Sequence, residues 1–343
     1  MNGIMRSFAS DNNSGVHPEV MAAIIEANRD HAAGYGDDRW TEQAEECVKK
    51  VFGREAHPFF LFNGTGANSV ALQAVTRSYN SILCASTAHI YVDECNAPAR
   101  MTGCQLIPVD TPDGKLTPEL LRPHLSHFGD CHHAQPGAVY IAQATELGTL
   151  YTVEEVRALA ALAHGHGMKL HMDGARLANA CAALGCTLRE ATVDAGVDIL
   201  SLGGTKNGMM MGEAVVAFDA AVAADIKYYR KQSAQLASKM RYLSAQFIPY
   251  LDGLWLRNAE HANAQARRLA DRLGRLPQLR ITQPVETNQL FVSMPRPIIE
   301  RLAEHYFFYV WNESADEVRF VTSWDTTDED MDGLVETLGS MLG

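Results

Sequence analysis

Four features of this chain combine residue types and positions that could carry out chemistry. Lys206 is the only charged residue in the stretch ILSLGGTKNGMMMG, where it lies among glycines, methionines and small hydroxyl side chains. Asp173 ends the apolar run MKLHMD, and His89 follows a second apolar run, SILCA. The turn NGTGAN, residues 63–68, precedes a helical segment, and such a turn offers free N–H groups and a positive dipole end to an anion. An amine, a carboxylate, an imidazole and an anion-binding turn could together hold a phosphorylated cofactor.

These groups match what pyridoxal phosphate needs from a protein. The cofactor requires a lysine that forms a Schiff base with it, an acid that keeps its pyridine nitrogen protonated, and an anchor for its phosphate, while an imidazole plane can stack on its ring. In a partly desolvated pocket the pKa of Lys206 would fall, which makes the neutral amine accessible. The sequence therefore predicts a pyridoxal-phosphate site made of Lys206, Asp173, His89 and the turn at Gly64 and Thr65.

Seven short apolar stretches predict buried β-strands, because each is rich in β-branched or large apolar residues and ends at a small or polar one. They cover residues 57–63, 81–85, 104–109, 137–143, 168–173, 198–204 and 213–218. Strand followed by helix, repeated about seven times, predicts an α/β fold with a mainly parallel seven-stranded sheet covered by helices on both faces. Ligands of such sheets bind beyond the carboxyl ends of the strands, where the four features above all fall.

The pattern changes after Phe218. Residues 220–251 read as one long helical stretch, and a further helix with strands at 287–294 and 317–324 predicts a small α/β domain. We therefore expect three parts, with a helix rather than a flexible linker between the two domains. They are an N-terminal arm, residues 1–15, a large cofactor-binding domain, residues 16–250, and a small C-terminal domain, residues 251–343.

The composition excludes several classes of protein. A hydrophobic content of 47% with 20% charged residues is typical of a soluble globular protein, and no apolar run is long enough to span a membrane. The first residues lack the apolar core of a secretory signal. A net charge of −12 argues against a nucleic-acid partner. Seven cysteines without a CxxC pair indicate reduced thiols. We therefore expect a cytoplasmic protein with a small-molecule substrate and with neither a nucleic-acid nor a membrane partner.

The stretch HLSHFGDCHH holds the densest group of metal-ligand residue types. It contains His124, His127, Cys131, His132 and His133. Zinc sites prefer separated pairs of ligands positioned by a defined turn, and no second pair lies at that spacing here. The sequence therefore predicts no metal site.

Several motifs, in order along nearly the whole chain, resemble the threonine aldolase family of fold-type I pyridoxal-phosphate enzymes. They are FASDNNSG, GYGDD, FNGTGANSVAL, AHIYVDE, LHMDGARLANA, LSLGGTKNG and VRFVTS. The most specific signal is HMDGAR followed about 30 residues later by a small residue and lysine. The group that they resemble most is the low-specificity bacterial one that includes phenylserine aldolase. The resemblance implies an aspartate aminotransferase-like large domain, and cleavage of L-β-hydroxy-α-amino acids to glycine and an aldehyde.

The resemblance also implies three sets of site residues. The catalytic set is Lys206, His89, His132 and Asp173. The cofactor-binding set is Gly64, Thr65, Gly66, His89, Asp173, Arg176, Thr205, Lys206 and Arg241. The substrate-binding set is Ser10, His132 and Arg319.

Within these sets, Arg176 would lie near the phenolic oxygen of the cofactor, and Ser10 and Arg319 would hold the substrate α-carboxylate. His132 would lie near the substrate hydroxyl, and it is the first choice for the base that removes the hydroxyl proton, because stacking occupies His89. Arg241 would reach the phosphate of a neighbouring subunit, which implies a homodimer or homotetramer with shared active sites.

Other interpretations remain open. Thr205 and Asn207 flank the lysine where many relatives have Ser and Gly, which favours the phenylserine-aldolase-like group over enzymes that act best on threonine. The same scaffold could support β-elimination or racemisation, because the sequence does not determine which bond to Cα is broken. A protein that binds the cofactor without catalysis is a third possibility. Asp173 could instead cap the helix that follows it, and Arg319 could pair with a surface carboxylate.

Overall fold

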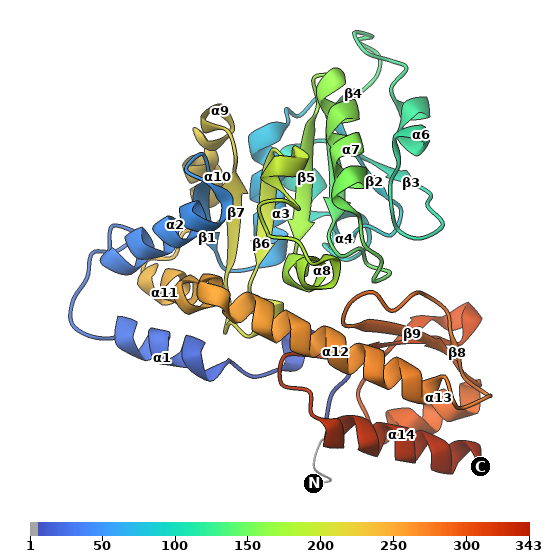
Figure 1. Ribbon diagram of the computed structural model, residues 1–343. Coiled ribbons are helices and arrows are strands. Elements are labelled where there is room, and N and C mark those ends of the chain that lie inside the picture. The colour runs from blue at the N-terminus through green and yellow to red at the C-terminus, as the bar shows by residue number, and fades with distance from the viewer. Residues whose placement is uncertain (1–5) are drawn as a thin grey trace.

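The computed structural model describes residues 6–343, and a seven-stranded sheet forms the centre of its larger part (Figure 1). The order of the strands is β1-β7-β6-β5-β4-β2-β3. All neighbours are parallel except β7, which is antiparallel to both β1 and β6. The strands are β1 (His57–Leu61), β2 (Asn80–Ala85), β3 (Gln105–Val109), β4 (Gln135–Ala142), β5 (Lys169–Gly174), β6 (Ile199–Gly203) and β7 (Glu213–Ala217). The predicted mainly parallel seven-stranded sheet is confirmed.

Helices cover both faces of this sheet, with α3 and α7 on opposite sides (Figure 1). Thr152 and Glu155 form a capping box at the start of α7, in which Thr is followed three residues later by Glu. The helices of the larger part are α1 (Pro18–Ala27), α2 (Arg39–Phe52), α3 (Gly64–Val75), α4 (His89–Val92), α5 (Ala97–Thr102), α6 (Pro118–Leu121), α7 (Val153–Gly165), α8 (Leu177–Leu184), α9 (Ala220–Ala223), α10 (Ile226–Gln232) and α11 (Arg241–Pro249). The carboxyl ends of the central strands point toward α12 (Trp255–Leu273) and the smaller part of the molecule.

The expectation of one long helix over residues 220–251 is wrong. The chain forms α9 and α10, leaves the helical path at Ala234 with φ of 57°, and resumes as α11 only at Arg241. The reason is tertiary: the side chain of Gln235 turns back to accept a hydrogen bond of 3.0 Å from the Phe62 N–H. This contact outweighs the local preference of the segment for helix.

The smaller part has its own sheet and core. The antiparallel sheet has the order β10-β11-β9-β8, with β8 (Arg280–Ile281), β9 (Gln289–Ser293), β10 (Tyr309–Asn312) and β11 (Glu317–Val321). Helices α13 (Arg296–Ala303) and α14 (Asp328–Leu342) pack against it. The expected domain boundary at residue 250 falls beside a kink, where Asp252 and Gly253 leave the helical conformation before α12 begins.

The N-terminal arm contacts both parts of the molecule, and its residue Phe8 belongs to the core of the smaller one. The Phe8 side chain is fully buried in the core of the small sheet. Its N–H donates to Phe307 O at 2.9 Å, and its carbonyl accepts from the Val321 N–H at 2.8 Å. The first five residues of the arm expected at 1–15 lie outside the described residues.

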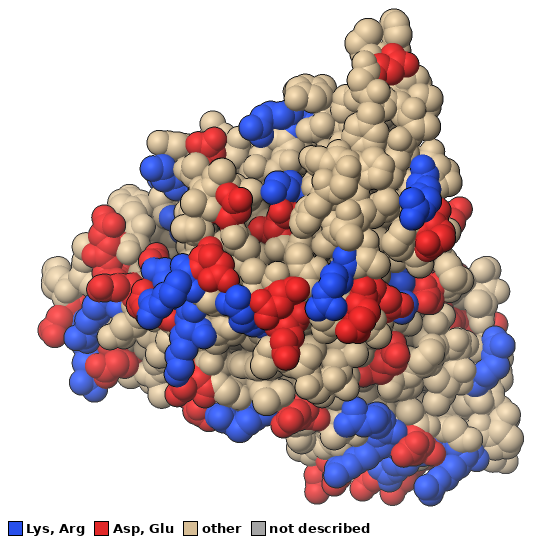
Figure 2. All heavy atoms as spheres, turned by 45° about the horizontal axis from the view of Figure 1, so that its top comes forward, with Lys and Arg blue, Asp and Glu red and all other residues tan. Residues whose placement is uncertain are grey.

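The surface carries charges of both signs. On the face in Figure 2, basic and acidic side chains are interspersed, and the projection at the top of the view carries few charges. Within residues 6–343 no helix has the length and apolar character that a membrane crossing needs. All seven cysteines lie within that range as free thiols.

Candidate active site

The structure brings five of the twelve predicted residues into the lining of one cavity at the carboxyl ends of the central strands. Gly64, His89, Asp173, Arg176 and Lys206 line it. Strands β5 and β6 are parallel neighbours, so the ends of both strands reach the same edge of the sheet. The predicted convergence of Asp173 and Lys206 follows from this pairing.

Lys206 lies in a short turn just beyond β6. The Thr205 hydroxyl accepts from the Gly212 N–H at 3.1 Å, which closes the turn on itself. Burial and the positive charge of Arg176 lower the pKa of Lys206. The Lys206 Nζ makes no hydrogen bond or ion pair with any residue in 6–343. The geometry thus gives Thr205 a part in holding the turn, and it leaves the lysine amine free to react.

Asp173 is a buried carboxylate with three hydrogen-bond donors. Its Oδ2 accepts from Asn68 Nδ2 and from the Tyr140 hydroxyl, both at 2.8 Å, and its Oδ1 accepts from the Ala175 N–H at 2.9 Å. Burial alone would raise the pKa of Asp173, but these hydrogen bonds outweigh it and hold the pKa below its ordinary value. The residue before α8 is Arg176, and no side chain caps that helix. Asp173 therefore does not serve as its N-cap.

His89 begins the short helix α4 and is held by Glu94, which the sequence analysis did not single out. The His89 Nδ1 lies 2.7 Å from Glu94 Oε1, and this buried carboxylate also accepts from Asn68 Nδ2 at 2.8 Å. The hydrogen bond to Glu94 raises the pKa of His89 against the effect of burial. Since Asn68 also donates to Asp173, one polar network orients both the imidazole and the carboxylate.

The glycine-rich turn fits a phosphate through two of its three predicted residues. The N–H groups of Gly64 and Thr65 open α3 and donate to no acceptor within residues 6–343, and a Cβ on Gly64 would meet nothing within 4 Å. Gly66 differs, because its N–H donates to Asn63 Oδ1 at 2.8 Å and a Cβ there would collide with the Gln235 side chain. The Gly66 N–H is therefore already engaged in this structure, where the glycine allows close packing, and its phosphate contact stays a prediction.

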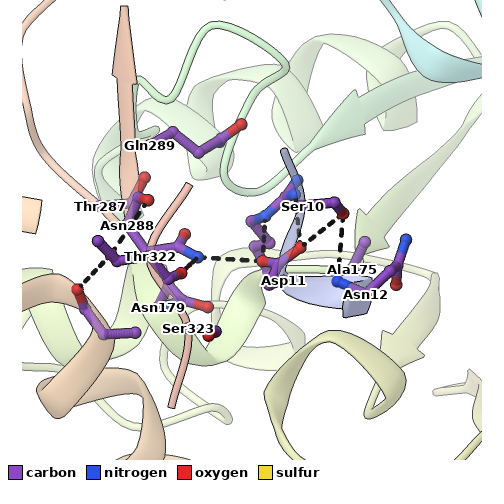
Figure 3. Close-up of polar contacts among 12 residues, drawn as sticks. Ser10, Asp11, Asn12, Ala175, Asn179, Thr287, Asn288, Gln289, Thr322 and Ser323 are labelled. Carbon is purple, nitrogen blue, oxygen red and sulfur yellow. Dashed lines mark hydrogen bonds and ion pairs between the residues drawn. The ribbon is translucent and has the colours of Figure 1, made fainter. Parts of the chain in front are cut away.

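Arg176 is held by a buried carboxylate of the N-terminal arm. Its Nε and Nη2 donate to the two oxygens of Asp11 at 2.8 and 2.9 Å. Asp11 also accepts from Asn288 Nδ2 at 3.0 Å, and Ser10 lies beside it at the start of a short turn (Figure 3). The buried pair thus places Ser10 next to the cavity. Asp11 is a second residue that the sequence analysis missed.

Arg319 lies on β11 as a half-buried side chain with few partners. Its Nη2 donates to Ala9 O at 3.4 Å, it packs over the Trp311 ring at 4.5 Å, and its Nε has no hydrogen-bond partner within residues 6–343. Burial, and then the charge of Arg176, lower the pKa of Arg319 to about 10. It forms no surface pair, because Glu317 accepts from Thr282 and Asp316 pairs with Arg296. A guanidinium with donors that are not used by the protein can bind a carboxylate ligand.

Replacement of Arg319 by glutamine is expected to raise KM for an amino acid substrate about 10- to 100-fold, with a smaller change in kcat, because a charged hydrogen bond contributes about 1.5–3 kcal/mol. Steady-state kinetics would measure this, with Arg296→Gln on the exposed surface as the matched control. An unchanged KM would contradict the assignment of the carboxylate site.

His132 and Arg241 are two of the predicted residues that do not line the cavity. His132 is exposed in the loop before β4, which projects from the opposite edge of the sheet (Figure 1). The eight residues of β4, at about 3.3 Å each, separate the two edges by roughly 25 Å. Arg241 donates to Asp30 O at 3.0 Å at the start of α11. The expectation that His132 lies near the substrate hydroxyl is therefore not met within one chain, because a residue that precedes a strand lies at its amino end.

The loop that carries His132 also gathers potential metal ligands. Ligand atoms of His127, Asp130 and His133 lie within 4.8 Å of one another, although the sequence offers no separated ligand pairs. The rings of His127 and His133 stack at 4.0 Å. The absence of a metal site stays a prediction.

Comparison with known proteins defines the class and the family. The fold matches an aspartate aminotransferase from Rhodobacter sphaeroides over 100% of this chain and 92% of that chain, with a TM-score of 0.73 and 14% identity. It matches threonine aldolase from Leishmania major over 98% of this chain and 99% of that chain, with a TM-score of 0.93 and 28% identity. This fold, with a free lysine amine, an ionised carboxylate and an open helix N-terminus in one cavity, defines a pyridoxal-phosphate enzyme of fold type I.

The sequence comparisons name the family. Residues 7–296 match the family described as beta-eliminating lyase. The chain is 45% identical over 341 residues to the low-specificity L-threonine aldolase of Pseudomonas aeruginosa, which covers 98% of each protein. The chain belongs to the threonine aldolase branch of the beta-eliminating lyase family.

Proposed function

We propose that this enzyme cleaves L-β-hydroxy-α-amino acids of the threonine, allo-threonine and phenylserine type to glycine and an aldehyde, by breaking the Cα–Cβ bond. The observation that carries the proposal is the cavity in which a free Lys206 amine lies with the Asp173 carboxylate and the Arg176 guanidinium. The 45% identity to a low-specificity L-threonine aldolase supports it.

Each residue of the cavity would have a separate role toward the cofactor. Pyridoxal phosphate, when bound, supplies an electron sink next to the substrate Cα. Asp173, kept ionised by its three hydrogen bonds, would hold a proton on the pyridine nitrogen. The free N–H groups of Gly64 and Thr65 would bind the phosphate, and the His89 imidazole would pack on the ring.

The substrate carboxylate would lie between the arm and the small sheet. Arg319 has an unpartnered Nε there, and Ser10 is the neighbour of Asp11, which is paired with the cavity residue Arg176. Arg176 keeps its remaining Nη1 for the ligand, since no hydrogen bond within residues 6–343 uses it. Bidentate recognition by arginine would orient Cα above the electron sink.

We also propose a homodimer or homotetramer with shared sites, in the cytoplasm. Two residues that the family pattern assigns to the site, His132 and Arg241, lie outside the cavity of their own chain. An apolar groove beside Arg241 includes Met210 and Met211, which are 40% and 42% exposed. Exposed apolar side chains of this kind favour an interface between copies. Light scattering on the purified protein would measure the mass, and a monomer would contradict the proposal.

Product analysis tests the reaction. The enzyme loaded with pyridoxal phosphate is incubated separately with L-threonine and with L-phenylserine. Glycine with acetaldehyde or benzaldehyde is the expected result, and the ratio of the two rates shows whether an aromatic side chain is preferred. Ammonia and a keto acid without glycine would instead indicate β-elimination, and appearance of the D-enantiomer would indicate racemisation.

A further inference from the structure

One carboxyl group in the cavity has no assigned role. Glu146 lines the same cavity as Lys206 and Asp173. Its Oε1 accepts a hydrogen bond of 2.7 Å from the His89 N–H, and its other oxygen accepts none from another residue in 6–343. Asp173 has three donors, and His89 pairs with Glu94. Glu94 Oε2 also has no partner within residues 6–343, but the Glu94 side chain is fully buried, whereas Glu146 is only half-buried. Of the two carboxyl groups with an unused oxygen, Glu146 is therefore the one that a ligand in the cavity can reach.

We propose that Glu146 is the base that takes the proton from the substrate β-hydroxyl, an inference that rests on the proposed function. As the O–H proton passes to the Glu146 carboxylate, the oxygen forms the C=O of the aldehyde. The Cα–Cβ bond breaks, and its electron pair stays with Cα. Cα then takes a proton from the Lys206 ammonium, which completes glycine. Glu146 releases its proton to water, and Lys206 regains one from water, so that protons and electrons balance.

The backbone around Glu146 fixes where the carboxylate lies. Glu146 follows β4, and the Thr145 and Thr149 hydroxyls of the same loop lie 2.6 Å apart. The Gln143 side chain also bonds both the N–H and the carbonyl of Tyr151, at 3.1 and 2.7 Å. A loop held on both sides of the residue gives the carboxylate a defined position, which a proton-transfer group needs.

The electrostatic surroundings suit proton exchange near neutral pH. Burial raises the pKa of Glu146 to about 7, with a contribution from the negative charge of Asp173, while the His89 N–H acts in the opposite direction. A base works best with a pKa near the working pH. The titratable and charged groups that face it or lie around the same cavity are Cys84, His89, Glu94, Tyr140, Tyr151, Asp173, Arg176 and Lys206. The carboxylate form accumulates as the pH rises through about 7, so the rate should rise there.

The alternative is that Glu146 only caps α4, because it accepts from the first N–H of that helix. Glutamine distinguishes the two roles, since its amide oxygen still accepts that hydrogen bond but cannot take a proton. Glu286 provides a matched control: it accepts from the Leu150 N–H at 2.9 Å and does not line the cavity.

The test compares the wild type, Glu146→Gln, Glu146→Asp and Glu286→Gln, each loaded with pyridoxal phosphate. We expect Glu146→Gln to lower kcat for L-phenylserine cleavage at least about 10²-fold and to remove the rise of rate with pH, as for loss of a general base. Glu146→Asp should keep the rise with a lower kcat, and Glu286→Gln should match the wild type. The absorbance of the bound cofactor should be unchanged in all three variants. Exchange of the glycine α-hydrogen in D₂O, followed by NMR, should also be unchanged in them, because glycine has no β-hydroxyl for Glu146 to deprotonate.

Three results would overturn the proposal. Glu146→Gln could cleave with the wild-type kcat and pH profile. Its cofactor binding or glycine exchange could fall as much as cleavage, which would indicate a structural role. The wild-type enzyme could exchange the glycine α-hydrogen without cleaving L-threonine or L-phenylserine, which would overturn the proposed function and this inference together. This result is distinguishable from the other two because it is seen in the wild type, before any variant is made.

Discussion

Replacement of Lys206 by alanine is expected to lower kcat by more than about 10³-fold while the protein still folds and binds its cofactor. The lysine amine is free of other partners within residues 6–343, so its loss breaks no ion pair that holds the fold. Burial already disfavours its charged form, which lowers its pKa. The cofactor can still be held without a covalent link. The backbone N–H groups of Gly64 and Thr65 remain in place to bind its phosphate, and the Asp173 carboxylate remains in place beside its ring nitrogen.

Absorption spectroscopy and equilibrium dialysis would check this result. The visible absorption that the cofactor acquires when linked to a lysine should disappear in Lys206→Ala, while dialysis still finds bound cofactor. Lys227→Ala, on the exposed side of α10, is the matched control and should keep the wild-type spectrum. A Lys206→Ala protein with the wild-type spectrum would show that another amine forms the link.

Replacement of Asp11 by alanine is expected to lower the free energy of unfolding by about 3–5 kcal/mol, because it leaves the Arg176 guanidinium buried without its counter-charge. The same change releases the arm that carries Ser10, so KM for the substrate should also rise. The double variant Asp11→Ala with Arg176→Met should recover part of the lost stability, because the unpaired charge is then removed.

Urea denaturation would measure this loss, with Asp325→Ala as the control. Asp325 pairs with Arg6 near the surface, and such a pair contributes about 1 kcal/mol or less. The pairing with Arg176 lowers the pKa of Asp11 from 3.8 despite its burial. Its contribution is therefore present above pH 3.8 and is lost as the pH falls through the lower pKa of the folded state. A loss below 1 kcal/mol in Asp11→Ala would show that the arm is held by other contacts.

The strands of the large sheet were predictable because parallel strands are buried on both faces. Such strands read as continuous apolar runs, which are visible in a single sequence. Each predicted run overlaps an observed strand, and the strand ends place Asp173 and Lys206 correctly at one edge. The cap of α7 was predictable for a similar reason, since both of its partners lie within three residues of each other.

Partners that are distant along the chain were not predictable. Asp11 and Arg176 lie 165 residues apart, and Asn68 and Asp173 lie 105 apart. A single Asp or Asn in a sequence carries no local pattern from which a hydrogen-bond or ion-pair partner so far along the chain could be predicted. Glu94 could have been noticed, because it follows His89 by five residues in AHIYVDE, but only the fold turns its carboxylate toward the imidazole.

By itself, the sequence determined the α/β fold, the cofactor and the residues at the carboxyl ends of the strands, because these follow from local apolar patterns and from the rule that parallel strands end at one edge. Only the tertiary structure decided which polar groups are engaged and which are free. In the folded chain His132 lies at the opposite edge of the sheet from the cavity, and the Gly66 N–H donates to Asn63. Arg176 is paired with Asp11, and one oxygen of Glu146 has no partner within residues 6–343. The physical reason is that a hydrogen bond or ion pair depends on distances across the fold, which no spacing along the chain specifies.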